Sequence, residues 1–249
     1  PGYDRHFRVT EYFGFELITV PMLPTGPDMD CVEALVKDEA VKGIWCVPLY
    51  SNPDGYSYSD ETVRRLAAME TAAPDFKFMW DNAYCVHHLT DTHDVSLNML
   101  EECRKAGHEY RALMFCSLSK VTFPGAGVAA MAASRRNIDY ILKNMFPMII
   151  SFDKLNQVRH IRFLKDMDGL AAHMEKHRAL LEPKFRAVLA ILDEGLSDCG
   201  SIARWTKPNG GYFLSLYTLG GCAKRTVQLC REAGVVLTDA GAAYPYGVD

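Results

Sequence analysis

Several features that define other classes of protein are missing from this sequence. Its eight cysteines form no Cys-x-x-Cys pair and no zinc-ligand spacing, which indicates reduced thiols and argues against a disulfide framework or a metal centre. No apolar stretch approaches the roughly 20 residues of a membrane helix, and the first residues lack the basic and apolar pattern of a secretion signal. We therefore expect a cytoplasmic protein without a membrane segment.

The sequence also has no large excess of positive or negative charge. The formal net charge is -4, and basic residues cluster only in pairs such as Arg64-Arg65 and Arg135-Arg136, which argues against a nucleic-acid surface. With 49% apolar and 23% charged residues, the 249-residue chain can form one large or two modest globular domains. A small-molecule partner is therefore expected. Since the sequence begins at Pro1 without Met and ends at Asp249 after a strand-like segment, we expect a piece of a longer protein.

Short apolar runs alternate with amphipathic helical runs along the first half of the sequence. This alternation predicts an α/β fold, with a mostly parallel sheet covered by helices on both faces. The expected strands are Phe15–Val20, Gly43–Pro48, Phe76–Trp80, Ala112–Cys116 and Val128–Ala133. The expected helices are Met29–Val36, Ser59–Met69, Ser96–Ala106, Asn137–Phe146, Asp153–Leu164 and a long helix from Gly169 to about Glu194.

The second part of the sequence has a different pattern. From Ala203 to Leu237 it alternates strand, turn, helix and strand, which is typical of the beginning of a smaller α+β domain. We therefore predict a large domain over residues 1–168. Residues 169–249 are predicted to form an interdomain helix and part of a second domain.

Polar segments follow three of the expected strands, where an open α/β sheet binds its ligands. These segments are Tyr50–Gly55, Asp81–Tyr84 and Ser117–Lys120. They are predicted to bring an amide, a carboxylate, a phenol and a lysine with two hydroxyls to one edge of the sheet. Each segment alone has an ordinary explanation as a turn, a helix cap or a surface lysine.

Together, in this order, the segments resemble the class I aminotransferases, enzymes of pyridoxal-phosphate fold type I. The residues of four motifs are similar to those of the subgroup called type Ic aspartate aminotransferases. These motifs are Trp45–Gly55, Trp80–Tyr84, Ser117–Lys120 and Lys207–Tyr212. The resemblance covers essentially all 249 residues. It leaves out the family's N-terminal cofactor loop and the C-terminal strand with the substrate-carboxylate arginine.

The resemblance implies pyridoxal 5'-phosphate (PLP) as the cofactor and assigns its main contacts. Lys120 would form the Schiff base and move a proton at the substrate α-carbon. Asp81 would keep the ring nitrogen of PLP protonated, so that the ring can act as an electron sink. Asn52 and Tyr84 would donate hydrogen bonds to the phenolic oxygen of PLP.

The phosphate of PLP requires hydroxyl groups and backbone N–H groups. Ser117, Ser119 and the turn Pro124–Gly127 are expected to supply them. Many family members carry a phosphate-binding arginine shortly after the lysine, whereas Gly125–Ala129 contains none, and its replacement is not identified. At the N-terminus, the resemblance implies that Tyr3 stacks on the pyridine ring and that His6 supports Asp81.

The resemblance further implies transfer of an amino group between a small, dicarboxylic, aspartate-like amino acid and a 2-oxo acid, in a homodimer. A dicarboxylate requires cationic contacts, and Lys154 and Arg159 are predicted for its distal carboxylate, with Asn52 as a further substrate contact. An exposed basic helix surface explains either cation equally well. Two alternatives stay open: a β-lyase or decarboxylase on the same fold, and an incomplete chain that serves only for binding or dimerisation.

Three other motifs have weaker support. Ser117–Lys120 also matches the Ser-x-x-Lys nucleophile motif, but the companion Lys-Thr-Gly and Ser-Asp-Asn triplets are absent. Gly125–Ala130 resembles a dinucleotide fingerprint, yet a β-like run follows it where a helix would be required. The histidines and aspartates of His87–Asp94 lack metal-ligand spacing, so a solvated loop is expected and no metal site.

Overall fold

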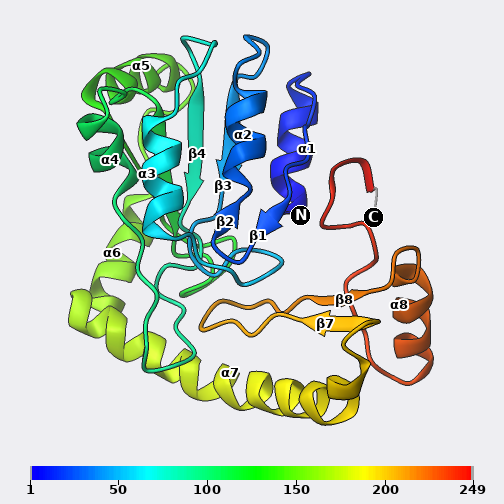
Figure 1. The fold of residues 1–249 in the computed structure, drawn as a ribbon. Helices are drawn as coiled ribbons and strands as arrows, with labels where there is room; N and C mark the ends of the chain where they lie inside the picture. The colour runs from blue at the N-terminus through cyan, green and yellow to red at the C-terminus, as the bar shows by residue number, and fades with distance from the viewer. Residues whose placement is uncertain (1, 248–249) are drawn as a thin grey trace.

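A computed structural model describes residues 2–247, and its centre is a four-stranded sheet (Figure 1). The strand order is β3 (Gly43–Cys46), β4 (Lys77–Asp81), β5 (Ala112–Ser117) and β6 (Ala129–Ala133). The first three strands are parallel, and β6 runs antiparallel to β5. The predicted mostly parallel sheet is confirmed. Pro1, where the sequence begins, and residues 248 and 249 lie outside the described residues.

The expected helices form with small shifts of their ends. The α-helices are α1 (Asp4–Tyr12), α2 (Met29–Leu35), α3 (Asp60–Ala68), α4 (Met99–Lys105), α5 (Arg135–Met145), α6 (Lys154–Leu164), α7 (Met167–Leu196) and α8 (Ala223–Glu232). Ser59 caps α3, since its side chain accepts a hydrogen bond from the Thr62 N–H. Helix α1 was not among the expected helices.

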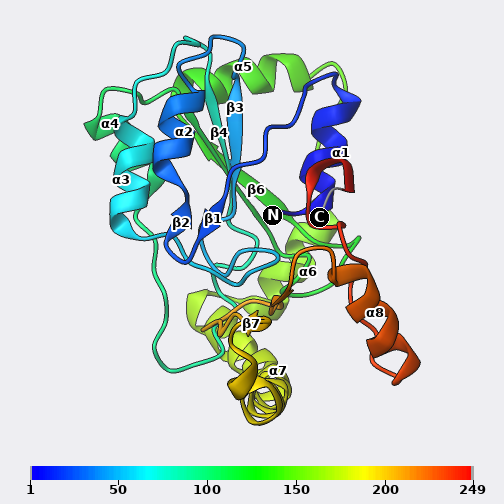
Figure 2. The same cartoon turned by 45° about the vertical axis from the view of Figure 1, so that its right-hand side comes forward.

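The main core lies between the sheet and helices α2, α3 and α4, which cover one face, while α1 and α6 lie on the opposite side (Figure 2). Side chains alternate between the two faces along each strand. Phe78 and Trp80 of β4 are therefore buried in the core. The neighbouring residues Met79 and Asp81 point to the other face. Asp81 thus lies on the same side of the sheet as α1.

A second region follows the long helix α7, which runs below the sheet (Figure 1). Strands β7 (Ala203–Trp205) and β8 (Leu216–Thr218) pair antiparallel, and α8 follows them. The indole of Trp205 donates to Asp193 of α7 at 3.1 Å, which connects this small sheet to the helix. The expected mixture of strands and helix is present in the tail.

Two expected strands are wrong. Phe15–Val20 has no strand conformation; the short strands β1 (Met22–Leu23) and β2 (Gly26–Pro27) form just after it. The last expected strand of the tail, ending at Leu237, is also irregular. A strand requires a neighbour to exchange backbone hydrogen bonds, and among the described residues neither segment has one. Apolar composition alone therefore predicted two strands that do not form.

Candidate active site

The carboxylate of Asp81, at the end of β4, is paired with a histidine from α1. His6 Nε2 donates to Asp81 Oδ2 at 3.0 Å, and the His6 side chain is almost completely buried. The His6 ring stacks on the indole of Trp45, with 4.1 Å between the ring centres and an angle of 7° between the planes. The indole in turn donates to Thr10 at 2.9 Å. These contacts hold the imidazole against the carboxylate, so His6 and Asp81, the pair that the family resemblance implied, are in contact.

Lys120 lies in the turn after β5, and its ammonium group is directed between two aromatic rings. Lys120 Nζ is 4.9 Å from the ring centre of Tyr84 and 5.7 Å from that of Tyr3. The Tyr3 ring also meets His6 edge-on, at 5.2 Å between centres. Tyr3, Tyr84 and Lys120 are therefore brought together as predicted, with the Asp81–His6 pair beside them.

The phenol of Tyr84 has an unusual environment. Burial raises the pKa of Tyr84 well above its ordinary value, and the negative charge of Asp81 raises it further. A hydrogen bond with the side chain of Asn52 opposes this effect in part. Tyr84 therefore remains protonated at neutral pH and can donate a hydrogen bond, with Asn52 beside it.

The serines around Lys120 form a compact turn. Ser117 Oγ donates to Ser119 Oγ at 2.9 Å and accepts from the Ser119 N–H at 3.1 Å. A Cβ atom on Gly127 would lie only 2.8 Å from Ser119 Oγ and 2.9 Å from Ser119 N. Only glycine therefore allows the turn after Lys120 to fold back onto the serines. Hydroxyl and backbone N–H groups gather here, which is the donor set that a phosphate group requires.

Helix α6 holds this turn from outside, a role that the sequence did not reveal. The Asn156 side-chain amide donates to the carbonyl oxygen of Ala126 at 2.6 Å. One turn later, His160 Nε2 lies 2.7 Å from the hydroxyl of Thr122. Both side chains are almost fully buried. The sequence signal for this role was the spacing of Asn156 and His160, which places two polar side chains on one face of the expected helix.

Two further residues contact Lys120 itself. His87 Nε2 and the Tyr212 hydroxyl each donate to the carbonyl oxygen of Lys120, both at 3.2 Å. His87 is only 3% exposed, so the expectation of a solvated loop is wrong at this position, although Asp91 and His93 are exposed. His87 is buried because its ring packs against Tyr84 and Tyr212. Across residues 2–247, no three side chains form a group suited to metal binding.

Lys154 and Arg159, predicted to contact the distal carboxylate, are not brought into this cluster. Both are exposed on α6, whose buried side carries Asn156 and His160. Within the described part of the chain, neither cation has a hydrogen bond or an ion pair with another residue. Their assignment therefore stays a prediction.

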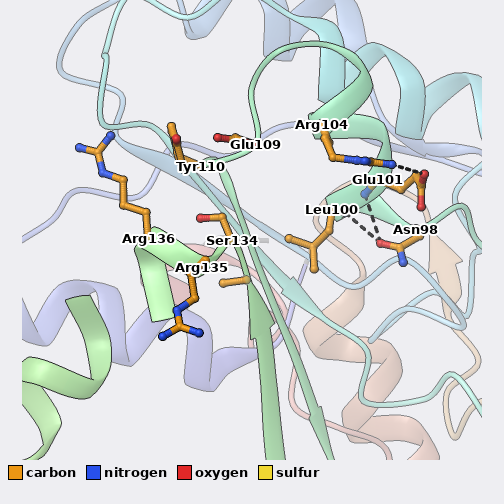
Figure 3. A pocket seen from close by; sticks show the side chains of 10 residues that line it. Asn98, Leu100, Glu101, Arg104, Glu109, Tyr110, Ser134, Arg135 and Arg136 are labelled. Atoms are coloured by element: carbon orange, nitrogen blue, oxygen red, sulfur yellow. Dashed lines mark hydrogen bonds and ion pairs between the residues drawn. The ribbon is translucent and has the colours of Figure 1, made fainter. Parts of the chain in front are cut away.

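Two hollows open on the surface of the molecule. The larger, of about 1100 Å³, reaches Tyr3, His6 and Asn52 and continues along β3. The smaller, of about 380 Å³, lies between α4 and the start of α5, where Arg136 lies over the Tyr110 ring (Figure 3). Of the predicted site residues, Tyr3, His6 and Asn52 line the larger hollow, and Lys120, Asp81 and Tyr84 line neither. Across residues 2–247, no helix combines the length and the apolar character needed to span a bilayer.

The family model for aspartate amino-transferases matches residues 1–249. The chain belongs to this aminotransferase family. The aspartate aminotransferase of Corynebacterium glutamicum is 48% identical over all of the chain, which spans 57% of that relative's length. A solved structure of an aspartate transaminase from the same species has a TM-score of 0.96 at 48% identity, with 100% of this chain and 58% of the other covered.

A more distant aminotransferase shares the fold. The α-aminoadipate aminotransferase LysN of Thermus thermophilus, solved with N-(5'-phosphopyridoxyl)-L-leucine, has a TM-score of 0.82 at 24% identity. All of this chain and 62% of that one are covered. In the aminotransferase chain described here, the observed groups fit a pyridoxal cofactor: an amine, an oriented carboxylate, phenols beside an amide, and a turn rich in hydroxyls and N–H groups.

Proposed function

We propose that the protein is a PLP-dependent aminotransferase that transfers the amino group of a small, dicarboxylic, aspartate-like amino acid to a 2-oxo acid. The placement of the Lys120 ammonium between Tyr3 and Tyr84, beside the Asp81–His6 pair, supports this most strongly. When bound, PLP supplies an electron sink that stabilises negative charge at the substrate α-carbon. The main contacts to the cofactor can be assigned to residues of this chain.

Each of these side chains has one task. The amine of Lys120 would hold the cofactor covalently and, once free, would move a proton at the substrate α-carbon. Asp81, held by His6, keeps the pyridine nitrogen protonated, because a nearby carboxylate favours the charged form of that nitrogen. Tyr84 and Asn52 would donate to the phenolic oxygen, and the Tyr3 ring would pack on the pyridine.

Ser117, Ser119 and the turn Pro124–Gly127 are proposed to bind the phosphate. The hydroxyls of the two serines already lie together, and Gly127 allows the turn to approach them closely. Backbone N–H groups in such a turn attract an anion without a cationic side chain. The turn therefore supplies phosphate donors where many relatives carry an arginine.

The test uses the full-length protein and its visible absorbance. Addition of PLP should produce an absorbance band that changes on addition of aspartate, and borohydride reduction should place a pyridoxyl group on Lys120 in peptide mapping. Lys120→Ala should lose both signals, whereas Lys105→Ala, on the exposed surface of α4, should keep them. An adduct on another residue, or none, contradicts the assignment. Release of ammonia or carbon dioxide in place of a 2-oxo acid would identify a lyase or a decarboxylase.

The dicarboxylate preference is tested at Lys154 and Arg159. Removal of a true distal anchor should weaken turnover of aspartate by about 2–5 kcal/mol and leave alanine nearly unaffected, since alanine has no second carboxylate. Lys154→Ala and Arg159→Ala are compared separately, with Lys143→Ala on α5 as the control. Equal losses for both donors would mark the residue as structural.

A homodimer is proposed because large apolar side chains are exposed along α5, the following segment and α6. They are Tyr140, Leu142, Phe146, Met148, Ile150, Phe152 and Leu155, of which Ile150 is 95% exposed. A cluster of exposed apolar side chains on adjoining segments is typical of a protein interface. Light scattering should give the mass of a dimer. Ile150→Asp should weaken dimer formation, and the control Val236→Asp should leave it unchanged. A monomeric wild-type protein at micromolar concentration contradicts the proposal.

The cellular location is proposed from the thiols. All eight cysteines are free, and Cys46 and Cys103 are buried without a partner cysteine. Free thiols persist in the reducing cytoplasm, where we place the protein.

A further inference from the structure

The carbonyl oxygen of Lys120 accepts two hydrogen bonds from side chains that are far away in the sequence. His87 Nε2 and the Tyr212 hydroxyl, 33 and 92 residues distant, both lie 3.2 Å from it. A carbonyl oxygen has two lone pairs, so these two donors satisfy it completely. The Lys120 peptide is thereby fixed from both sides, outside any helix or strand.

His87 makes this contact with a proton on Nε2, and its surroundings favour the neutral ring. The carbonyl oxygen of Lys120 can only accept, so Nε2 must carry the hydrogen. The other nitrogen, Nδ1, is buried and has no partner among the described residues. A second proton would be left without an acceptor in a buried position near the Lys120 cation, and burial lowers the pKa of His87. His87 is therefore a permanent donor near neutral pH.

Tyr212 reaches the same carbonyl because two glycines precede it. A Cβ atom on Gly210 would lie 2.5 Å from the Tyr50 ring and 2.6 Å from the carbonyl oxygen of His87. The Gly211 N–H donates to that His87 oxygen at 2.7 Å, and its φ of +80° favours glycine. The segment before Tyr212 is thus docked on His87. The two donors form one unit built from opposite halves of the chain.

We propose that His87 and Tyr212 are positioning residues that hold the Lys120 peptide so that its amine stays between Tyr3 and Tyr84, ready to capture PLP. The inference rests on the proposed function. In the capture step, a C=N bond forms between Lys120 Nζ and the aldehyde carbon, and the aldehyde oxygen leaves as water. No electron is gained or lost overall. The two donors touch neither reacting atom, so they act only through the main chain of Lys120.

Because His87 and Tyr212 donate to the same carbonyl oxygen, the effects of removing them should depend on each other. If one donor is removed, the carbonyl keeps the other, and the loss should be modest. If both are removed, a buried carbonyl is left unpaired, which is far more costly than the loss of either bond. The double variant should therefore be slower than the product of the two single effects.

The experiment strips PLP from the full-length protein, adds it back, and follows visible absorbance by stopped flow at saturating PLP. The measured quantity is the rate constant of the covalent step. Tyr212→Phe and His87→Leu should each slow it about two- to tenfold, the effect of one hydrogen bond. His87→Gln keeps an N–H donor and should stay within about twofold of wild type. Thr62→Val, which loses a buried hydroxyl of α3 that donates to the Thr25 carbonyl oxygen, controls for general destabilisation.

The outcomes separate the two proposals. If wild-type protein fails to capture PLP, the proposed function is wrong, and this inference fails with it. If wild type captures PLP but the single and double variants keep its rate constant, only the positioning role is wrong. Slowing in Thr62→Val equal to that in Tyr212→Phe would also refute it, because the effect would then follow stability. Slowing confined to the His87 and Tyr212 variants, with rescue by His87→Gln, supports it.

Discussion

Replacement of Tyr217 by phenylalanine tests how the turn that carries Asn52 is held. The Tyr217 hydroxyl, on β8, donates to Asp54 Oδ1 at 2.5 Å, and Asp54 is only 1% exposed. The other oxygen, Oδ2, has no partner among the described residues. Tyr217 is therefore the main contact that satisfies a buried carboxylate in this turn.

The expected magnitude follows from these contacts. Phenylalanine preserves the ring and its packing beneath the Arg204 guanidinium, which lies 3.8 Å from the ring centre, so the change removes little beyond the hydroxyl. A hydrogen bond to a charged group contributes about 1.5–3 kcal/mol to the free energy of unfolding. For a chain of this size, that loss corresponds to a decrease in melting temperature of roughly 3–12 °C.

Thermal unfolding followed by circular dichroism measures this decrease. The control is Tyr110→Phe, at a partly exposed tyrosine near α5, which should change the free energy of unfolding by less than about 0.5 kcal/mol. If Tyr217→Phe melts within a degree of Tyr110→Phe, the Asp54 contact contributes nothing measurable and the reasoning is refuted.

Three further predictions concern the turn and its neighbours. Because burial lowers the pKa of His87, the unfolded chain binds a proton below about pH 6.5 that the folded chain excludes. The free energy of unfolding in urea should therefore fall as the pH decreases through this range, less steeply in His87→Gln. Asn156→Leu leaves the Ala126 carbonyl unpaired and should lose about 1–3 kcal/mol in the same assay, unlike Asn144→Leu on exposed α5. Gly127→Ala should weaken PLP binding in absorbance titrations, since its Cβ would force the turn apart.

The sequence predicted the parts of the fold and site that depend on local pattern. Asp81 and Lys120 follow β-rich runs, and parallel strands carry such residues to one edge of a sheet. The Ser59 cap of α3 is likewise a local signal that the structure confirms. His6 was assigned through the family resemblance, and its contact with Asp81 bridges 75 residues that no periodicity connects.

What the sequence failed to predict depends on contacts between distant segments. Phe15–Val20 is as apolar as the true strands, but strand formation requires a neighbouring strand as well as composition. His87 lies in a polar run that suggested solvent, and only the approach of Gly210 and Tyr212 buries it. The prediction was wrong because burial is decided by packing across the chain.

The turn around Lys120 explains why so many polar side chains are buried in one place. Outside helices and strands, buried carbonyl oxygens must find donors elsewhere. The Lys120 carbonyl is satisfied by His87 and Tyr212, and that of Val121 accepts from His173 Nε2 at 2.8 Å, while α6 supplies the donor for the Ala126 carbonyl. The donors come from the loop after β4, from α6 and α7, and from the segment before β8. An irregular turn leaves Lys120 free to point into the site, and side chains from four other segments give that turn the rigidity that regular structure would otherwise provide.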